Sequence, residues 1–431
     1  MTKPLHFSRR EFIAASAATA LVPQLEAGIA PAASSRPVSY LVILADQLTW
    51  WMCDPAQRGV LALPNIDRLR AEGTLFDRCY ANSPWCPTSR SSLRNGLFSH
   101  ANPGGIALQQ PAETVEFRLR EAGLATRYLG KWHLSPNPTP SEFVQPADRL
   151  NWDWFVGHEK SHQLEATFVQ DDPTPLSTAP WDPAAMTDFA LRMLREDAAQ
   201  DRPFFMHVNY LPPHQPYAAY PPSLGVYTAA DAQLRPNSMG APGVAANYLG
   251  HYMNLVRSVD IEVGRLLDEL EVLGTDVVVV FTSDHGDMLW SQGLKYKRVP
   301  YEESVRVPLI VRGPGWQPGV VNHPVGLVDL ARTFAGIGQG LHLRHWRDSV
   351  YFEMPTTPDP SKNWSSAAWR GLVTDDGWKL AIGGGGARLL FDLSNDPYEL
   401  KDRSGKGLIQ ETELEIRMRE WARATGDDFF G

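Results

Sequence analysis

Short apolar runs that end in polar clusters recur along this chain. Val38–Ala45 and Val277–Thr282 are almost continuously hydrophobic, which is typical of parallel strands buried on both faces. Asp46 and Gln47 follow the first run, and Ser283–Asp287 follows the second. Ligands of open α/β sheets bind at the carboxyl ends of such strands, so we expect the two polar clusters to meet at one edge of a sheet.

Helical and strand patterns alternate between these runs, as they do in α/β domains. The hydrophobic spacing predicts helices at Asn65–Gly73, Ser89–Asn95, Val115–Ala122, Ala185–Ala199, Ala246–Leu273 and Val328–Gly336. Strands are expected at Thr74–Tyr80, Ala125–Leu129 and Pro203–Asn209, and Tyr301–Val311 is a further apolar run. Residues 134–185 are rich in Pro, Trp and Asp without a clear period, and we interpret them as a long insertion that lines a cleft.

The pattern changes beyond about residue 345. Trp369–Thr374, Trp378–Ile382 and Ala387–Leu393 are typical of short antiparallel strands, and a charged helix is expected at Ile409–Ala424. We therefore expect a catalytic α/β domain over residues 34–345 and a smaller C-terminal α+β subdomain over residues 346–431.

Residues 1–33 have the pattern of an export signal. Ser8–Phe12 contains two consecutive arginines, the weakly apolar Ile13–Val22 follows, and Ala30–Ala32 is a small-residue cleavage site. We interpret these parts, in this order, as a twin-arginine signal peptide; a disordered basic tail is the alternative. The protein is then expected to be periplasmic or secreted, with the twin-arginine translocase as a partner.

Composition and charge narrow the class of protein. The chain has 431 residues, 43% of them hydrophobic, which is enough for one large core and a small accessory domain. The formal net charge is -9, and removing the signal takes away three basic and two acidic side chains, which makes the charge about -10. This balance argues against nucleic acid or an anionic membrane as the main partner. Beyond the signal, no apolar run is long enough to span a bilayer.

The residues at the two strand ends favour a divalent cation. Asp46, Gln47, Asp284 and His285 offer carboxylate and amide oxygens, which suit calcium, magnesium or manganese, and the imidazole favours manganese or another transition metal. Zinc held by thiolates is not favoured, because the cysteines have no paired spacing. Each acid taken alone could be a helix cap or a solvated turn.

Cys86 is the candidate nucleophile. It is one of three cysteines, with Cys53 and Cys79, so at least one thiol has no intrachain partner, although a bridge between the other two is compatible with the sequence. Cys86 precedes a predicted helix, whose N-terminus favours an anion, and Arg90 follows four residues later. The alternative is a small buried hydrophobic residue, which the polar neighbours of Cys86 make less fitting.

Four further residues could supply positive charge and a general acid. Lys131 and His133 follow a predicted strand, His214 lies in a proline-rich turn, and Lys297 lies in a loop. An anionic transition state needs fixed positive charge, and a departing alkoxide needs a proton donor. Each residue alone could equally be a surface charge or a polar group whose hydrogen bonds are satisfied. We therefore predict that the four residues lie together around the metal.

The chain resembles the sulfatase family of the alkaline-phosphatase-like superfamily. Matching motifs run in order through nearly all of the chain after the signal: VSYLVILADQ, LPNIDRLRAEGTLFDRCYANSPWCPTSR, GKWHL, PFFMHVNYLPPHQPY, VDIEVGRLLDEL, VVVVFTSDHGDMLWSQG, KRVPYEESVRVPLIVRGPG and LFDLSNDPYEL. The resemblance implies a large mixed central sheet sandwiched by helices, followed by a smaller C-terminal antiparallel sheet. It implies a metal-dependent hydrolase of sulfate esters.

The resemblance also implies the roles of individual residues. Cys86 would be oxidised to formylglycine by a formylglycine-generating enzyme before export; one hydroxyl of the hydrated aldehyde attacks sulfur, and the second helps to expel sulfate. The metal would be bound by Asp46, Gln47, Asp284 and His285, and the hydrated aldehyde at Cys86 would be a further ligand. Arg90 and Lys131 would steady the formylglycine, with His133 nearby. Lys297 and His214 would contact the sulfate and the leaving oxygen, and His214 is the preferred acid ahead of His133.

The sequence departs from the family pattern in three places. Thr88 takes a position that is usually proline, Gln47 replaces a commoner aspartate, and His285 replaces a commoner asparagine. The last two resemble choline sulfatases and phosphonate monoester hydrolases. A phosphodiesterase or phosphonate monoester hydrolase with unmodified Cys86 is therefore the alternative enzyme, and a non-catalytic binding protein is the alternative of another class. The substrate is expected to be a small-molecule or saccharide ester. Aromatic side chains of the long insertion could stack on such a substrate, or they could be packing that covers the edge of the sheet: Trp152, Trp154, Phe155 and Trp181.

Overall fold

The computed structural model describes most of the chain after the predicted signal. The described residues are 37–102, 113–136, 138, 141–149, 151–159, 168–174, 182–345, 347–355 and 368–431. Residues Pro37–Gly431 form one compact unit. The predicted signal peptide and Trp181 lie outside the described residues.

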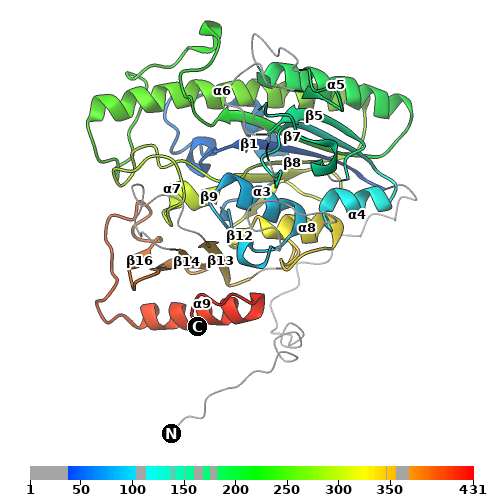
Figure 1. The fold of residues 1–431 in the computed structure, drawn as a ribbon. Helices are drawn as coiled ribbons and strands as arrows, with labels where there is room; N and C mark the ends of the chain where they lie inside the picture. The colour runs from blue at the N-terminus through cyan, green and yellow to red at the C-terminus, as the bar shows by residue number, and fades with distance from the viewer. Residues whose placement is uncertain are drawn as a thin grey trace. The chain divides into compact units, whose positions relative to one another are not determined.

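A mixed β-sheet forms the centre of this unit (Figure 1). Its strands, in spatial order, are β11 (Gly319–Val321), β2 (Thr74–Phe76), β10 (Leu309–Arg312), β8 (Val277–Ser283), β1 (Ser39–Asp46), β7 (Phe204–Pro213), β4 (Ala125–Lys131), β5 (Trp154–His158) and β6 (Phe168–Val169). Strand β1 is parallel to β7 and β8, and β4 is parallel to β7 and β5. The carboxyl ends of these five strands therefore lie along the same edge of the sheet.

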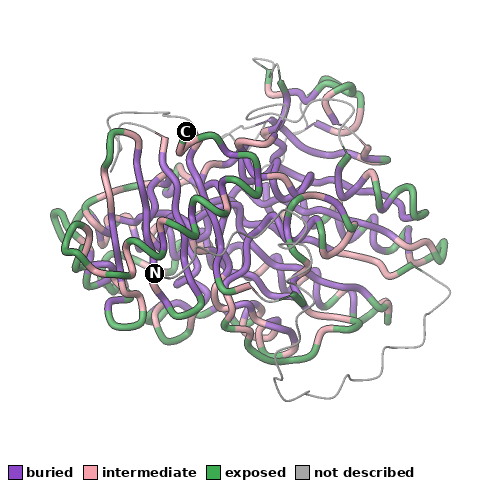
Figure 2. Tube along the Cα trace, turned by 90° about the horizontal axis from the view of Figure 1, so that it is seen from below, coloured by how far each residue is buried: buried purple, intermediate pink, exposed green. Residues whose placement is uncertain are grey.

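Helices cover both faces of the central sheet (Figure 1). On one face lie α2 (Pro64–Glu72), α5 (Asp182–Ala199) and α6 (Pro242–Leu273); on the other lie α3 (Cys86–Asn95), α4 (Val115–Glu121) and α8 (Val328–Ala335). Each face has its own buried apolar cluster, and Figure 2 shows that buried residues run through the interior of the described chain while most exposed residues lie at its periphery. Burial on both faces explains why β1 and β8 are hydrophobic runs without alternation.

A second, antiparallel sheet follows near the C-terminus. Its order is β13 (Ser349–Met354), β14 (Trp369–Thr374), β15 (Trp378–Gly383) and β16 (Arg388–Asp392), and α9 (Ile409–Thr425) packs on β14 and β15. The expected fold class, a large mixed sheet between helices with a smaller C-terminal antiparallel sheet, is confirmed. The pattern predicted β14, β15, β16 and α9 but missed β13.

Several local predictions need correction. The supposed loop at residues 134–185 contains β5 and β6, which extend the central sheet, because Trp152 and Phe155 pack against Tyr128 in the core. The expected strand Thr74–Tyr80 is two strands, β2 and β3 (Cys79–Tyr80). Shorter elements complete the described chain: the helices η2 (Trp50–Cys53), η3 (Ser99–Ala101), η4 (Pro146–Asp148), η5 (Pro222–Leu224) and α7 (Glu302–Val305), and the strands β9 (Arg306–Val307) and β12 (Val325–Gly326).

The structure bears on two expectations from the sequence, one about the cysteines and one about membrane-spanning segments. Cys53, Cys79 and Cys86 are all buried free thiols, so the structure has no bridge between the first two. Within the described residues, none of the helices combines the length and the apolar character that crossing a membrane requires.

Candidate active site

The edge formed by the parallel strand ends gathers the predicted site residues. Asp46 ends β1, Asp284 directly follows β8, Lys131 ends β4 and His214 directly follows β7. Gly130 allows the close approach of β4 to β7: it has φ +97°, and a Cβ there would lie 2.0 Å from the Asn209 carbonyl oxygen. The sheet thus brings together groups that are far apart in sequence.

Four side chains converge at this edge, and we call them the sheet-edge cluster: Asp46, Cys86, Asp284 and His285. One ligand atom from each lies within 4.8 Å of the others, and all four residues are buried. Cys86 Sγ is 3.1 Å from His285 Nε2 and 3.9 Å from Asp46 Oδ1, and His285 Nε2 is 3.6 Å from Asp284 Oδ1. Cys86 is the first residue of α3, one turn earlier than the helix start predicted at Ser89.

Arg90 and Lys131 place two buried cations against the carboxylates. Arg90 Nε donates to Asp284 Oδ2 (3.0 Å) and Arg90 Nη2 donates to Asp46 Oδ2 (3.2 Å). Lys131 Nζ donates to Asp46 Oδ2 and lies 3.9 Å from Cys86 Sγ. Asn209 accepts from Arg90 Nη1 (3.2 Å) and holds the guanidinium from a third side. These charge-assisted hydrogen bonds hold the charged ends of the Arg90 and Lys131 side chains in fixed, buried positions.

The backbone of Gln47 contacts the sheet-edge cluster, and its side chain contacts a neighbouring group of polar residues. It has φ +67°, and its N–H donates to Asp284 Oδ1 (3.1 Å). Its amide nitrogen donates to Asp287 Oδ2 (2.5 Å) and Tyr217 Oη (2.9 Å), while its amide oxygen accepts from Lys297. Lys297 is therefore next to the cluster, as the sequence predicted.

The two candidate acids also lie beside Cys86. Burial is the main factor that lowers the pKa of His133 to about 4 and that of His214 to about 3, and Lys131 lowers both further. Cys86 opposes this effect and by itself raises the pKa of both imidazoles. His214 Nδ1 also lies 2.9 Å from the Gln215 carbonyl oxygen, which fixes the orientation of its ring.

The electrostatics of the cluster suit a bound cation. Burial alone would raise the pKa of the Cys86 thiol, but Lys131, Lys297 and His285 together hold it well below its usual value. Burial and the neighbouring Asp46 raise the pKa of Asp284. Two carboxylates, a sulfur and an imidazole nitrogen therefore face one another in a buried space, where Arg90 and Lys131 offset part of the negative charge. This donor set is a candidate site for a divalent cation.

Sequence reasoning missed several residues that organise the site. Asn209, Tyr217 and Asp287 contact Arg90 or Gln47, and Ser89 donates from its hydroxyl to the Asp284 carbonyl. Asn209 ends a predicted strand and Asp287 ends the second polar cluster, so their positions near strand ends could have marked both as candidate site residues. The hydrophobic pattern does not indicate which side chain each of them would contact.

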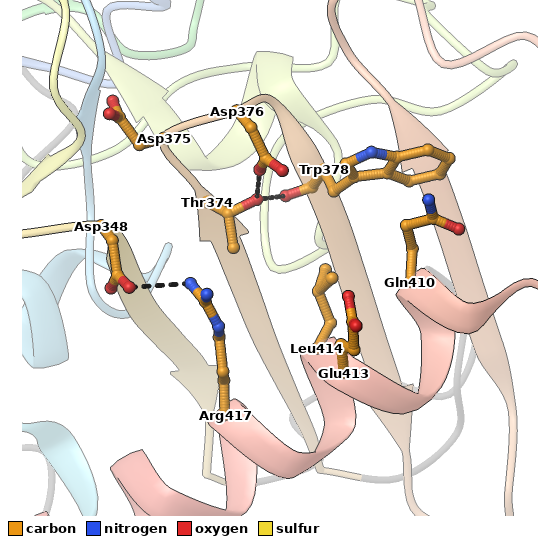
Figure 3. Close-up of a pocket in the computed structure, with 9 residues that line it drawn as sticks. All are labelled: Asp348, Thr374, Asp375, Asp376, Trp378, Gln410, Glu413, Leu414 and Arg417. Carbon is orange, nitrogen blue, oxygen red and sulfur yellow. Dashed lines mark hydrogen bonds and ion pairs between the residues drawn. The ribbon is translucent and has the colours of Figure 1, made fainter.

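Two other features of the described residues are separate from this edge. His100, Glu353 and Asp427 form a second buried group, which we call the C-terminal cluster. A hollow of about 280 Å³ lies between α9 and the turn joining β14 to β15 (Figure 3). Its lining residues include Trp378 and Arg417 but none of the predicted site residues.

Comparison with known proteins establishes the class. Residues 39–340 match the sequence profile of the Sulfatase family. The chain belongs to the sulfatase family and is a sulfuric ester hydrolase by class.

Two relatives illustrate the range of that family. An ulvan-active sulfatase from Formosa agariphila is 26% identical over 398 residues, covering 85% of this chain and 77% of the relative. A choline-sulfatase from Rhizobium meliloti is 25% identical over 452 residues, covering 88% of this chain and 86% of the relative.

Solved structures share the fold. A YidJ protein from Bacteroides fragilis aligns with a TM-score of 0.80 at 23% identity, covering 93% of this chain and 99% of that one. A phosphonate monoester hydrolase from Agrobacterium radiobacter aligns with a TM-score of 0.71 at 20% identity, covering 90% of this chain and 95% of that one. The profile match confirms the predicted membership of the sulfatase family, and the solved structures confirm the fold.

Proposed function

We propose that this protein hydrolyses sulfate monoesters at the sheet-edge cluster, with Cys86 as the position of the nucleophile. The convergence of Cys86 with two carboxylates and two buried cations, Arg90 and Lys131, carries the proposal. An anionic transition state needs charge that is already in place, and hydrogen-bonded, buried cations provide it without reorganisation.

A divalent cation, calcium or manganese, would be held by Asp46, Gln47, Asp284 and His285 beside residue 86. When bound, it would polarise the ester as a Lewis acid. Arg90 orients two of these ligands at once, because its guanidinium donates to both carboxylates. The Gln47 N–H further fixes Asp284. Supporting hydrogen bonds of this kind orient metal ligands.

Cys86 would be converted to formylglycine, whose hydrated form supplies the attacking hydroxyl. Lys131, 3.9 Å from Sγ, would steady this group together with Arg90. Lys297 would contact the sulfate. His214 would give a proton to the leaving oxygen, with His133 as the second candidate for that role. Because burial lowers the pKa of both imidazoles, the negative charge of the bound ester would have to raise it again for either to carry that proton.

The substrate class follows from the relatives. One of them is named for its activity on ulvan and another for choline sulfate, so both saccharide and small-molecule sulfate esters are represented. We propose a sulfated saccharide or small-molecule ester for this chain, which its own buried cations would draw in despite the negative net charge.

A phosphodiester or phosphonate ester is the second candidate substrate. Gln47 and His285 favour it, because they occupy positions where this sequence resembles phosphonate monoester hydrolases. Cys86 Sγ lies 3.1 Å from His285 Nε2 and would then act as an unmodified ligand or nucleophile. A phosphate monoester carries one more negative charge than a sulfate monoester and would demand more cationic partners.

Intact mass and ester assays test both candidates. Conversion of Cys86 to formylglycine lowers the mass by about 18 Da, and peptide mapping should place the change at residue 86 while Cys53 and Cys79 remain thiols as internal controls. Hydrolysis of an aryl sulfate in preference to matched phosphodiester and phosphonate esters supports the first candidate. An unmodified Cys86 in active protein from the native host would rule out the formylglycine route.

Export and domain organisation are proposals of the same kind. We propose that residues 1–33 direct the protein to the twin-arginine translocase, and that residues 34–345 and 346–431 are the catalytic domain and the C-terminal subdomain. The family match ends at residue 340, which supports the second boundary. Replacing Arg9 and Arg10 by lysine should leave the protein in the cytoplasm; unchanged export would contradict the proposed route.

A further inference from the structure

Lys295 is an exposed cation surrounded by aromatic rings. Its Nζ lies 5.0 Å from the ring centre of Trp290, 5.8 Å from that of Tyr248 and 5.9 Å from that of Tyr296. No described carboxylate forms an ion pair with it. Three rings hold the ammonium in place without neutralising its charge, so it remains available to an anion.

The loop that carries Lys295 has an unusual backbone. Within Leu289–Arg298, five residues other than glycine have a positive φ: Leu289 (42°), Trp290 (69°), Gln292 (55°), Tyr296 (69°) and Arg298 (81°). Residues other than glycine rarely adopt such conformations, which concentrate at functional sites.

Asp287 attaches this loop to the proposed reaction centre. Its Oδ1 accepts from the backbone N–H groups of Leu289 (2.9 Å) and Tyr296 (3.1 Å), one near each end of the loop. Its Oδ2 accepts from the Gln47 side chain (2.5 Å). One carboxylate therefore ties the position of the loop to that of a proposed metal ligand.

The rings around Lys295 reach the same centre. Tyr248 packs on Tyr217 with ring centres 4.7 Å apart, and Tyr217 accepts from the Gln47 amide (2.9 Å). Lys297, which donates to Gln47, is two residues from Lys295, so their Cα atoms are separated by at most roughly 7 Å. Lys295 thus lies next to the reaction centre but, unlike Lys297, is exposed to solvent.

We propose that Lys295 determines specificity by binding a second anionic group, a carboxylate or a second sulfate, on the leaving-alcohol side of the substrate. Trp290 acts as a positioning residue that holds the ammonium toward this group. The inference rests on the proposed ester hydrolysis. It adds to it a preference for substrates that carry two negative charges, one at the scissile ester and one a few ångströms away.

Three aryl sulfates test this proposal: 4-nitrophenyl sulfate, 4-(sulfooxy)benzoate and benzene-1,4-bis(sulfate). For Lys295→Met we expect the ratio of kcat/KM between either dianionic ester and 4-nitrophenyl sulfate to fall about fivefold relative to wild type, mainly through KM, as for a partly exposed ion pair. Comparing each variant with wild type on the same ester removes the difference in leaving groups. The two dianionic esters distinguish a carboxylate from a sulfate as the second group.

Matched variants separate the roles. Lys295→Arg should keep the ratio, Trp290→Ala should lower it by a similar or smaller factor, and Trp290→Phe should restore most of it. Lys401→Met removes an exposed lysine that the C-terminal sheet region carries and should leave the ratio unchanged.

The outcomes are distinct. An unchanged ratio in Lys295→Met, or an equal loss on all three esters, overturns the assignment of Lys295 while leaving ester hydrolysis intact. Failure of the wild-type enzyme on every sulfate ester overturns the proposed function, and this inference with it.

Discussion

The sheet-edge cluster and the C-terminal cluster contain similar residues but are built differently. Both gather histidine and carboxylate side chains, buried or nearly so, with ligand atoms within 4.8 Å. In the C-terminal cluster, Arg370 lies among the acids: its Nη2 donates to Asp427 Oδ1 (2.8 Å) and its Nε lies 3.4 Å from Glu353 Oε2. Tyr351 donates a further hydrogen bond to Asp427 (2.6 Å).

His100 completes the C-terminal cluster and joins two parts of the fold. Its backbone N–H donates to Glu353 Oε1 (3.0 Å), and its Nδ1 lies 2.9 Å from Glu353 Oε2. His100 belongs to η3, just after α3, while Glu353 belongs to β13. The cluster therefore attaches the C-terminal sheet to the helix that begins at Cys86.

The contrast between the two clusters indicates that residue composition alone does not identify a candidate metal site. In the C-terminal cluster the Arg370 guanidinium already lies between the carboxylates of Glu353 and Asp427, and these groups pair with one another. In the sheet-edge cluster Arg90 and Lys131 also donate to the carboxylates, but this cluster adds the sulfur of Cys86 and a fourth ligand atom within 4.8 Å of the others. We therefore assign chemistry to the first cluster and mechanical attachment to the second.

The largest expected effect is on catalysis. Cys86→Ala removes the proposed attacking group and should lower kcat/KM toward a sulfate ester by at least about 1000-fold. Cys53→Ala, at a buried free thiol outside the cluster, is the matched control and should retain activity after correction for folded protein. Full activity in Cys86→Ala would mean that the cluster does not supply the nucleophile.

Removing the cation should have the next largest effect. Dialysis against a chelator should lower activity by about 100-fold or more, because the metal charge stabilises the transition state, and manganese or calcium should restore it. Metal content should be one ion per chain and should disappear in Asp284→Asn. If Glu353→Gln removed the ion instead, the assignments of the two clusters would have to be exchanged.

The C-terminal cluster should show its role in stability. Arg370→Leu leaves Asp427 and Glu353 buried without their cation, which should lower the free energy of unfolding by about 3–5 kcal/mol. Denaturant titration measures this, and kcat/KM per folded molecule should change by less than about threefold. Tyr351→Phe, which removes one hydrogen bond, should cost only about 1 kcal/mol. A large loss of kcat/KM in folded Arg370→Leu would instead link this cluster to catalysis.

The smallest expected effect is a pH dependence of stability at His100. Burial opposes the charged imidazole, but Glu353 and Asp427 outweigh it and raise the pKa of His100 even with Arg370 nearby. A raised folded-state pKa stabilises the protein below the unfolded value, about 6.5, and this contribution is lost as the pH rises through the folded-state value. His100→Gln should flatten the dependence of Tm on pH above 6.5, by a few degrees at most. His323→Gln is the control, at a half-buried histidine whose Nδ1 lies 3.2 Å from Asp375, and equal curves for His100→Gln and wild type would contradict the assignment.

Hydrophobic patterning predicted much of the fold and the site. The uninterrupted runs at β1 and β8 could only be buried strands, and the polar residues after them had to lie at the sheet edge. The same reasoning placed Lys131 and His214 correctly, since both come at the ends of parallel strands. It failed at β5, which lies in the Pro- and Trp-rich stretch of residues 134–185, and at β13, a six-residue run that was not recognised although turn-forming residues follow it.

Three features could be read from the chain alone: the burial of the central strands on both faces, the polar residues at the strand ends, and the order of the elements. All three depend on local hydrophobic periodicity and on the residue at which each apolar run ends. Tertiary structure alone decided that Arg90 holds both carboxylates, that Asp287 ties a strained loop to Gln47, and that Arg370 fills the C-terminal cluster. Those contacts join residues tens to hundreds of positions apart. Their partners are chosen by the packing of whole elements, which no local pattern encodes.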